Sequence, residues 1–198
     1  ENKRVTLVNN ELCMINPSLK DGVISKLQQN HPEWGYDYDN LLLSAQHTHV
    51  GPRGFSLHPL YSMSSPGFVR EIYDKIVNGI YEAIVQAENS KASGKVQIGQ
   101  GEFDKRMTLL QVTDEKGNPK GSINWFAVHT TNLPNNWTKI CSDNKGFAAT
   151  DLETSYNEEN KAYVGAFAQG ACGDVSARVK YNPRLDRQRG YWEGPFED

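Results

Sequence analysis

Residues 66–88 carry the pattern of a long amphipathic helix, and such a helix needs a second layer to pack against. Ser65 stands where helix N-caps are favoured, and Pro66 stands in the first turn, where proline fits without losing a hydrogen bond. Apolar side chains then recur every three or four positions along one face: Phe68, Ile72, Ile76, Ile80, Ala83, Ile84 and Ala87. This spacing predicts core packing, and we assign it no chemistry.

Short apolar runs on either side of this helix predict β-strands. A shorter helix is expected over residues 18–29, with Ser18 as its N-cap and with Val23, Ile24 and Leu27 on its buried face. Strands that alternate with helices indicate an α/β fold, here a mixed sheet with flanking helices. The runs expected to form strands are 5–8, 12–15, 41–45, 95–103, 106–113, 121–128 and 162–168.

Composition favours a single folded domain over residues 1–198 and argues against nucleic acid as a partner. The chain is long enough to bury a core, and no repeat, low-complexity tract or linker divides it. It has 21 basic and 24 acidic residues, so it lacks the basic excess typical of nucleic-acid binding. Its three cysteines show no C-x-x-C spacing, which leaves open both one disulfide with a free thiol and three reduced thiols.

Two histidines stand one residue apart directly after the run 41–45, in the sequence Q-H-T-H-V-G-P. Side chains two apart on a strand share a face, so His47 and His49 are expected to project into one site. His129 follows the run 121–128 in a similar position, and neutral imidazoles are preferred zinc ligands. The alternative is an ordinary hydrogen-bonded histidine at each strand end. The H-x-H spacing together with a third strand-terminal histidine favours a shared metal.

Ser176 follows the run 162–168 in the small-residue sequence G-D-V-S. A turn of this kind can present a hydroxyl at the end of a strand, but the G-x-S-x-G pattern of a nucleophile elbow is not matched. Asp174 is most simply explained as a turn former. On spacing alone, Ser176 is therefore interpreted as structural rather than catalytic.

Four sequence blocks, in the same order along the chain, resemble the neutral/alkaline non-lysosomal ceramidase family. Residues 45–52 (A-Q-H-T-H-V-G-P) are similar to its S-x-T-H-T-H-S-G-P segment, and residues 124–129 match its N-W-F-A-V-H. Residues 143–148 (D-N-K-G-F-A) resemble D-N-K-G-Y-A. The fourth block, A-F-A-Q followed by G-D-V-S, is similar to A-F-x-x-S-N-x-G-D-V-S-P-N.

The resemblance implies a zinc-dependent amidase that hydrolyses the N-acyl bond of ceramide, or of a related N-acyl lipid, to a sphingoid base and a fatty acid. His47 and His129 correspond to zinc ligands, and His49 corresponds to the second histidine of the pair, close to the metal. Ser176 corresponds to the active-site serine, acting as nucleophile or as a hydroxyl that positions the substrate. The resemblance further implies a ceramide-like lipid amide as partner, peripheral contact with a membrane, and a secreted, periplasmic or cell-surface location.

The chain also departs from the family pattern. Ala177 and Arg178 stand where the family has P-N after the serine, and a family loop carrying a substrate-contacting arginine is absent between residues 99 and 110. The family's other zinc ligands, a Glu and a Tyr, lie C-terminal of the serine. We therefore expect a portion of a larger zinc-amidase catalytic domain, without its first strands and its C-terminal half. Two alternative functions are a degenerate, non-catalytic binding module with the amidase fold and a hydrolase of another amide.

Overall fold

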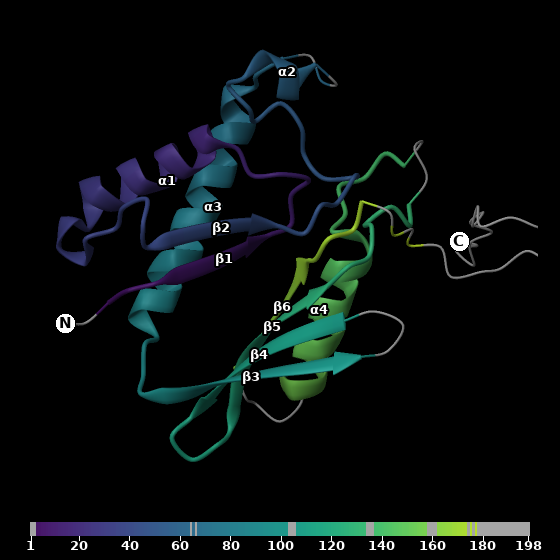
Figure 1. Ribbon diagram of the computed structural model, residues 1–198. Helices are drawn as coiled ribbons and strands as arrows, with labels where there is room; N and C mark the ends of the chain where they lie inside the picture. Colours follow the sequence, from purple (N-terminus) through teal and green to yellow (C-terminus); the bar gives the residue numbers. More distant parts are fainter. Residues whose placement is uncertain are drawn as a thin grey trace, which may run out of the picture.

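The computed structural model describes residues 3–63, 65, 67–102, 106–133, 137–157, 162–173, 175 and 177. It confirms the expected α/β class, with strands in two sheets and helices packed on them (Figure 1). One sheet contains β1 (Thr6–Asn10) and β2 (Leu41–Ala45), which pair in parallel. The other is mixed, in the order β3-β4-β5-β6. Its strands are β3 (Gly94–Glu102), β4 (Arg106–Asp114), β5 (Pro119–Phe126) and β6 (Val164–Gln169).

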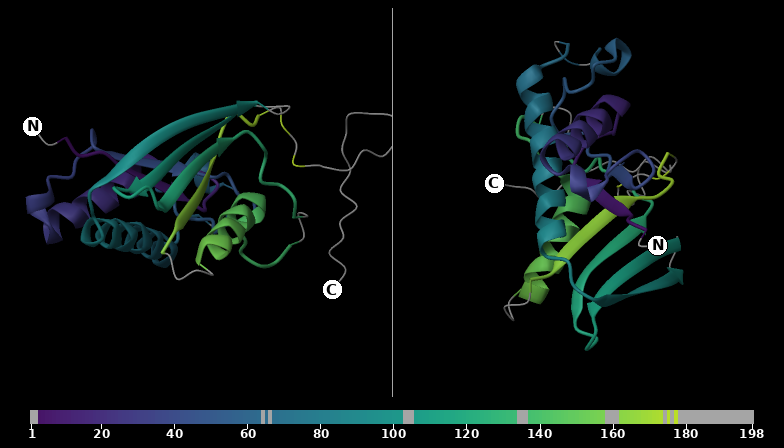
Figure 2. Two further views of the ribbon diagram at one scale, coloured as in Figure 1. Left: turned by 90° about the horizontal axis from the view of Figure 1, so that it is seen from below. Right: turned by 90° about the vertical axis from the view of Figure 1, so that its left-hand side faces the viewer.

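The helices are α1 (Pro17–Asn30), α2 (Pro59–Ser62), α3 (Arg70–Asn89) and α4 (Asp143–Asn157), with a short 3-10 helix at Pro32–Trp34. Figure 2 shows α3 and α4 on the same side of the strands. The main core lies where α1 and α3 cover β1 and β2, and its centre includes Leu19, Leu27, Leu41 and Ile84. None of the described helices is long and apolar enough to cross a membrane.

The two sheets meet along β1 and β6. The side chain of Asn9 on β1 donates a hydrogen bond of 3.2 Å to the carbonyl oxygen of Phe167 on β6. The strands β1 and β2 are parallel to each other, and so are β5 and β6. The segments that follow β2 and β5 lie side by side, because an isolated parallel bridge joins Thr48 to Thr130.

Two expected helix starts are wrong. The first helix is capped by Asn16, whose Oδ1 accepts from the Leu19 amide at 3.1 Å, and not by Ser18. The long helix begins at Arg70 rather than at residue 66, and Pro66 lies outside the described residues. The Val69 amide instead donates to the carbonyl of Gly54 at 2.7 Å. Gly54 has φ of +78° and a Cβ there would lie 2.9 Å from the carbonyl oxygen of Gly67, so this approach requires glycine.

Residues 12–15 do not form the expected strand. The carbonyl oxygens of Leu12 and Cys13 accept hydrogen bonds from the backbone and the ring of His47, so they pair with that residue rather than with a strand. The helix α4 was not expected at all. Its buried positions are Asp143, Lys145 and Gly146, and its Phe147 is exposed, so it has no apolar stripe for a pattern to detect.

Candidate metal centre

Three histidine rings gather beyond the ends of β2 and β5. The ring centroid of His47 lies 4.8 Å from that of His49 and 4.9 Å from that of His129. The His49 and His129 centroids are 5.2 Å apart. The structure therefore brings together the three histidines singled out in the sequence, and their roles as ligands stay a prediction.

The histidine pair does not meet by the alternation of a strand, which was the reason expected. β2 ends at Ala45, and His47 adopts φ of +73°, in the left-handed region that non-glycine residues rarely occupy. Two contacts hold the chain in this conformation. The His49 amide donates to the carbonyl of Thr130 at 3.3 Å, and the Thr130 hydroxyl donates to the carbonyl of His47. The turn, rather than a continuing strand, therefore aims the two rings at each other.

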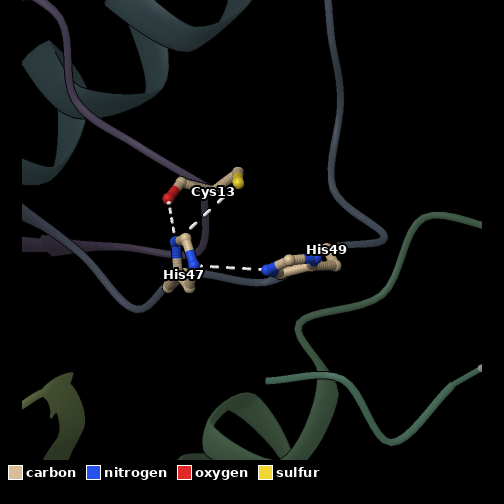
Figure 3. Close-up of side chains that lie close together, drawn as sticks. All are labelled: Cys13, His47 and His49. Carbon is tan, nitrogen blue, oxygen red and sulfur yellow. Dashed lines mark hydrogen bonds between the residues drawn. The ribbon is translucent and has the colours of Figure 1, made fainter. Parts of the chain in front are cut away.

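Each of two imidazoles is fixed through its Nδ1 atom by a backbone carbonyl. Nδ1 of His47 lies 2.8 Å from the carbonyl oxygen of Cys13, and Nδ1 of His129 lies 2.9 Å from that of Cys172. A dashed line in Figure 3 marks the contact between His47 and Cys13. A carbonyl can only accept, so Nδ1 carries the proton in both rings. The lone pair is then on Nε2. Histidines that bind metals are commonly held in this way, with the other ring nitrogen donating to a carbonyl.

Nearby ligand atoms could complete a metal site with these rings. Cys13, His47 and His49 form one group whose ligand atoms all lie within 4.8 Å of one another, and His47, His129 and Cys172 form another. Zinc bond lengths of about 2.0–2.3 Å place tetrahedral ligand atoms roughly 3.3–3.8 Å apart, so small shifts would close either group. The sequence showed no metal spacing for the cysteines, and both were missed. The carbonyls of both cysteines orient the histidines, and Sγ of Cys13 lies 3.8 Å from Nδ1 of His47.

His49 differs from the other two histidines in its environment. Its Nε2 lies 3.2 Å from Nε2 of His47, and its ring borders a cavity of about 210 Å³. Burial and the neighbouring His47 and His129 hold the pKa of His49 below its usual range. A neutral imidazole beside a cavity can accept a proton from a group bound there.

The start of α4 supports the segment that carries His129. The buried Asp143 carboxylate accepts from the backbone amides of Asn132 and Asn144, at 3.0 and 2.6 Å, and Asp143 itself has φ of +58°. The Asn144 amide group donates to the carbonyl oxygen of His129 at 3.0 Å. These residues belong to the D-N-K-G block, which the sequence marked by resemblance without indicating what it does.

Lys145 follows in the same block and is only 3% exposed. Its ammonium group donates to the carbonyl oxygens of Phe126 and Ala168, at 2.7 and 3.1 Å, near the ends of β5 and β6. Burial lowers the pKa of Lys145 to about 8, while the nearby Cys172 opposes part of that shift. A positive charge therefore lies against the ends of β5 and β6, next to the segment that carries His129.

Ser176 and Asp174 lie outside the described residues, so the roles expected for them stay predictions. Val175, which stands between them in the chain, is described. Its carbonyl oxygen accepts from the backbone amide of His129 at 3.1 Å. The G-D-V-S segment therefore meets the metal centre at this residue.

Comparison with known proteins points to one family. A model described as neutral/alkaline non-lysosomal ceramidase, N-terminal, matches residues 1–105 and 100–185. Neutral ceramidase A from Dictyostelium discoideum is 33% identical over 212 residues, covering 91% of this chain and 30% of that protein. The neutral ceramidase of Pseudomonas aeruginosa is 31% identical over 221 residues, covering 99% of this chain and 32% of that protein. The chain thus spans about a third of these relatives.

Two solved structures agree with these sequence matches. The crystal structure of the Pseudomonas aeruginosa neutral ceramidase superposes on the whole chain with a TM-score of 0.87 and 30% identity, and the match covers 34% of that chain. A ceramidase complexed with C2 gives a TM-score of 0.82 at 31% identity, over 87% of this chain and 30% of the other.

Proposed function

Because this chain belongs to the neutral/alkaline non-lysosomal ceramidase family, we propose that it forms part of a zinc-dependent amide hydrolase. The bond cleaved is the N-acyl bond of ceramide or of a related N-acyl lipid, and residues 1–198 belong to a longer catalytic domain. The observation that carries the proposal is the pair of imidazoles at His47 and His129. Both are fixed at Nδ1 by carbonyls, and their rings lie 4.9 Å apart.

His47 and His129 fit zinc in their donor chemistry, because each would offer a neutral Nε2. Catalytic zinc sites use three protein ligands, so at least one further ligand joins these two. Bound zinc would supply Lewis-acid polarisation of the amide carbonyl. The carbonyls of Cys13 and Cys172 hold the rings of His47 and His129 in place. The two rings therefore need not be ordered when zinc binds.

His49 acts as the proton acceptor in this proposal. Its pKa is lowered by burial and by the neighbouring rings, so the imidazole is neutral at neutral pH and one of its two nitrogens keeps a lone pair that can take a proton. A carboxylate outside these residues is the other acceptor that the chemistry allows. Ser176 attacks or orients the scissile carbonyl. The cavity beside His49, lined in part by Phe55 and Tyr61, receives part of the substrate.

A lipid substrate also requires contact with the surface in which it is dissolved, and the segment around α2 suits that task. Residues 54–69 contain no Asp, Glu, Lys or Arg, and Arg53 and Arg70 flank them. Within this segment Leu60 is 61% exposed and Met63 is 76% exposed. Figure 1 shows α2 at the end of the molecule away from the four-stranded sheet. Leu57, Tyr61 and Phe68 extend the exposed apolar surface.

The membrane contact is tested by sedimentation of the full-length protein with phosphatidylcholine vesicles. We expect Leu60→Glu and Met63→Glu to lower the bound fraction several-fold, because a charge must leave water on insertion. Ile98→Glu is the matched control, since Ile98 is 73% exposed on β3, in the other sheet. Unchanged binding by both α2 variants would remove the membrane contact from the proposal while leaving the amidase proposal in place.

The activity is tested with the full-length protein on ceramides and on other N-acyl substrates, before and after treatment with a chelator. We expect fatty acid to be released from ceramide, with loss on chelation and recovery on zinc addition. Release only from other amides would reassign the substrate. Zinc binding without release from any of them would favour the degenerate binding module. Activity and metal content that survive His47→Ala would refute the mechanism.

A further inference from the structure

Gln169, the last residue of β6, binds both chain segments that carry the candidate ligands. Its Oε1 accepts from the backbone amide of Val128 at 3.2 Å, and its Nε2 donates to the carbonyl of Val128 at 2.8 Å. The same Nε2 donates to the carbonyl of Gln46 at 3.2 Å. Val128 and Gln46 are the residues directly before His129 and His47. One side chain therefore contacts the backbone next to each of the two imidazoles.

We propose that Gln169 is a positioning residue for the metal centre and sets the separation of the His47 and His129 segments. The inference rests on the proposed function, because it assumes that these two histidines bind one ion. It concerns a residue to which the histidine motifs and the family blocks gave no role. Gln169 would act through the backbone of its neighbours and would not touch the metal or the substrate.

A glutamine side chain suits this position because its amide group has the same donor and acceptor as a peptide. With Val128 it makes the two-bond pairing that a neighbouring strand would make. Its second N–H reaches Gln46, whose own side chain is 1% exposed and donates to the carbonyl of Ser142 at 3.0 Å. Exchange of the oxygen and nitrogen of Gln169 would set its NH₂ against the Val128 amide, so the hydrogen bonds fix the orientation.

The link lies on one side of the histidines, and a second link lies on the other. After His47 and His129 in the chain, Thr48 and Thr130 form the isolated bridge between the two segments. Before them, Gln169 joins Gln46 to Val128. The ligand-bearing residues are thus held from both directions. Metal–ligand distances tolerate only about 0.2 Å of error, so a change in this separation acts directly on affinity.

The test compares zinc affinity in the full-length protein and its Gln169→Glu and Gln169→Met variants, measured by competition with a chromophoric chelator. Glu keeps the acceptor for the Val128 amide but turns a carboxylate oxygen towards two carbonyls. Met keeps the length and removes all three hydrogen bonds. We expect zinc to bind about 10–100-fold more weakly in both, as for other residues that orient ligands. Gln97→Glu, at an exposed position on β3, should leave the affinity unchanged.

Two further measurements separate positioning from general stability. The visible absorption of the cobalt-loaded protein reports ligand geometry, and it should change in the Gln169 variants but not in Gln97→Glu. The thermal midpoint of the metal-free protein shows whether each variant folds. If Gln169→Glu does not fold, the comparison rests on Gln169→Met. A folded Gln169→Met protein with native zinc affinity and a native cobalt spectrum would overturn this inference alone. Absence of zinc binding by the unaltered protein would instead overturn the proposed function.

Discussion

The ammonium group of Lys145 donates a hydrogen bond of 2.7 Å to the carbonyl oxygen of Phe126, the last residue of β5. A second bond of 3.1 Å reaches the carbonyl of Ala168 on β6. Both of these partners are carbonyl oxygens rather than carboxylates. The charge is therefore held at the ends of two neighbouring parallel strands, and the segment that carries His129 begins directly after Phe126.

The burial of Lys145 predicts a rise in stability with alkaline pH. Its pKa falls from 10.5 to about 8 on folding because burial disfavours the charged form. Between about pH 8 and 10.5 the unfolded chain then binds more protons than the folded chain, so the free energy of unfolding increases with pH. Relative to Lys145→Met, the unaltered protein should gain up to roughly 3 kcal/mol across this window. Urea unfolding at pH 7, 8.5 and 10 measures the difference. Lys75→Met, at an exposed position, should show no such trend.

The three histidines should separate into two ligands and one proton acceptor. His47→Ala and His129→Ala each remove a donor atom, so each should weaken zinc binding by more than the roughly 10–100-fold expected for a supporting residue. His49→Ala should retain zinc within a few-fold while the rate of amide hydrolysis falls by about 10²–10⁴. Zinc content after dialysis and kcat/KM on a short-chain N-acyl substrate check the two effects. Loss of zinc in His49→Ala would make His49 a ligand.

The positions of most strands and of the core helices followed from local pattern, because apolar periodicity responds to burial on one face; the strand expected at residues 12–15 does not form. The strand 41–45 and the buried face of α1 are examples. The helix α4 could not be found in this way. It buries Asp143 and Lys145 and exposes Phe147, so its position depends on hydrogen bonds to distant segments rather than on an apolar stripe.

The meeting of His47, His49 and His129 was foreseeable, but its geometric cause was not. Strand alternation was the expected cause, whereas the left-handed φ of His47 and the contacts with Thr130 bring the rings together. Gln169 gave no local signal, because its partner Val128 lies 41 residues away in the chain. A residue that acts through contacts with distant backbone groups adds nothing to the periodic pattern of the sequence, so its role can be recognised only in the structure.

Asp143 should be required for the shape of the loop that follows His129. Its carboxylate accepts from the amides of Asn132, Leu133 and Asn144, and Asp143→Ala would leave these donors without it. A lost partner costs about 1–3 kcal/mol for a buried donor, so we expect a loss of roughly 2–4 kcal/mol in the free energy of unfolding. Denaturant titration measures it. Asp151→Ala, at an exposed position in the same helix, is the control, and equal losses in the two variants would contradict the role of Asp143.

Glu88 near the end of α3 joins the helix to the N-terminal segment, and its environment predicts an acid-sensitive contribution to stability. Its carboxylate accepts from the Tyr36 hydroxyl at 2.7 Å and pairs with Arg4 at 3.3 Å and Lys91 at 2.5 Å. Burial raises the pKa of this carboxyl, but the bonds from Lys91 and Tyr36 and the charge of Arg4 outweigh burial and leave the pKa below its ordinary 4.5. The folded state therefore favours the carboxylate.

A group whose pKa falls on folding stabilises the protein fully above its unfolded pKa, and that stabilisation is lost as the pH falls through the folded pKa. Glu88→Gln should thus lower the free energy of unfolding by roughly 1–3 kcal/mol at pH 7. The difference from the unaltered protein should shrink as the pH drops below about 4.5, where protonation imitates the substitution. Urea unfolding from pH 7 to pH 3 measures it, with the exposed Glu82→Gln on the same helix as control. A deficit that stayed constant over this range would mean that packing at residue 88, rather than its charge, stabilises the contact.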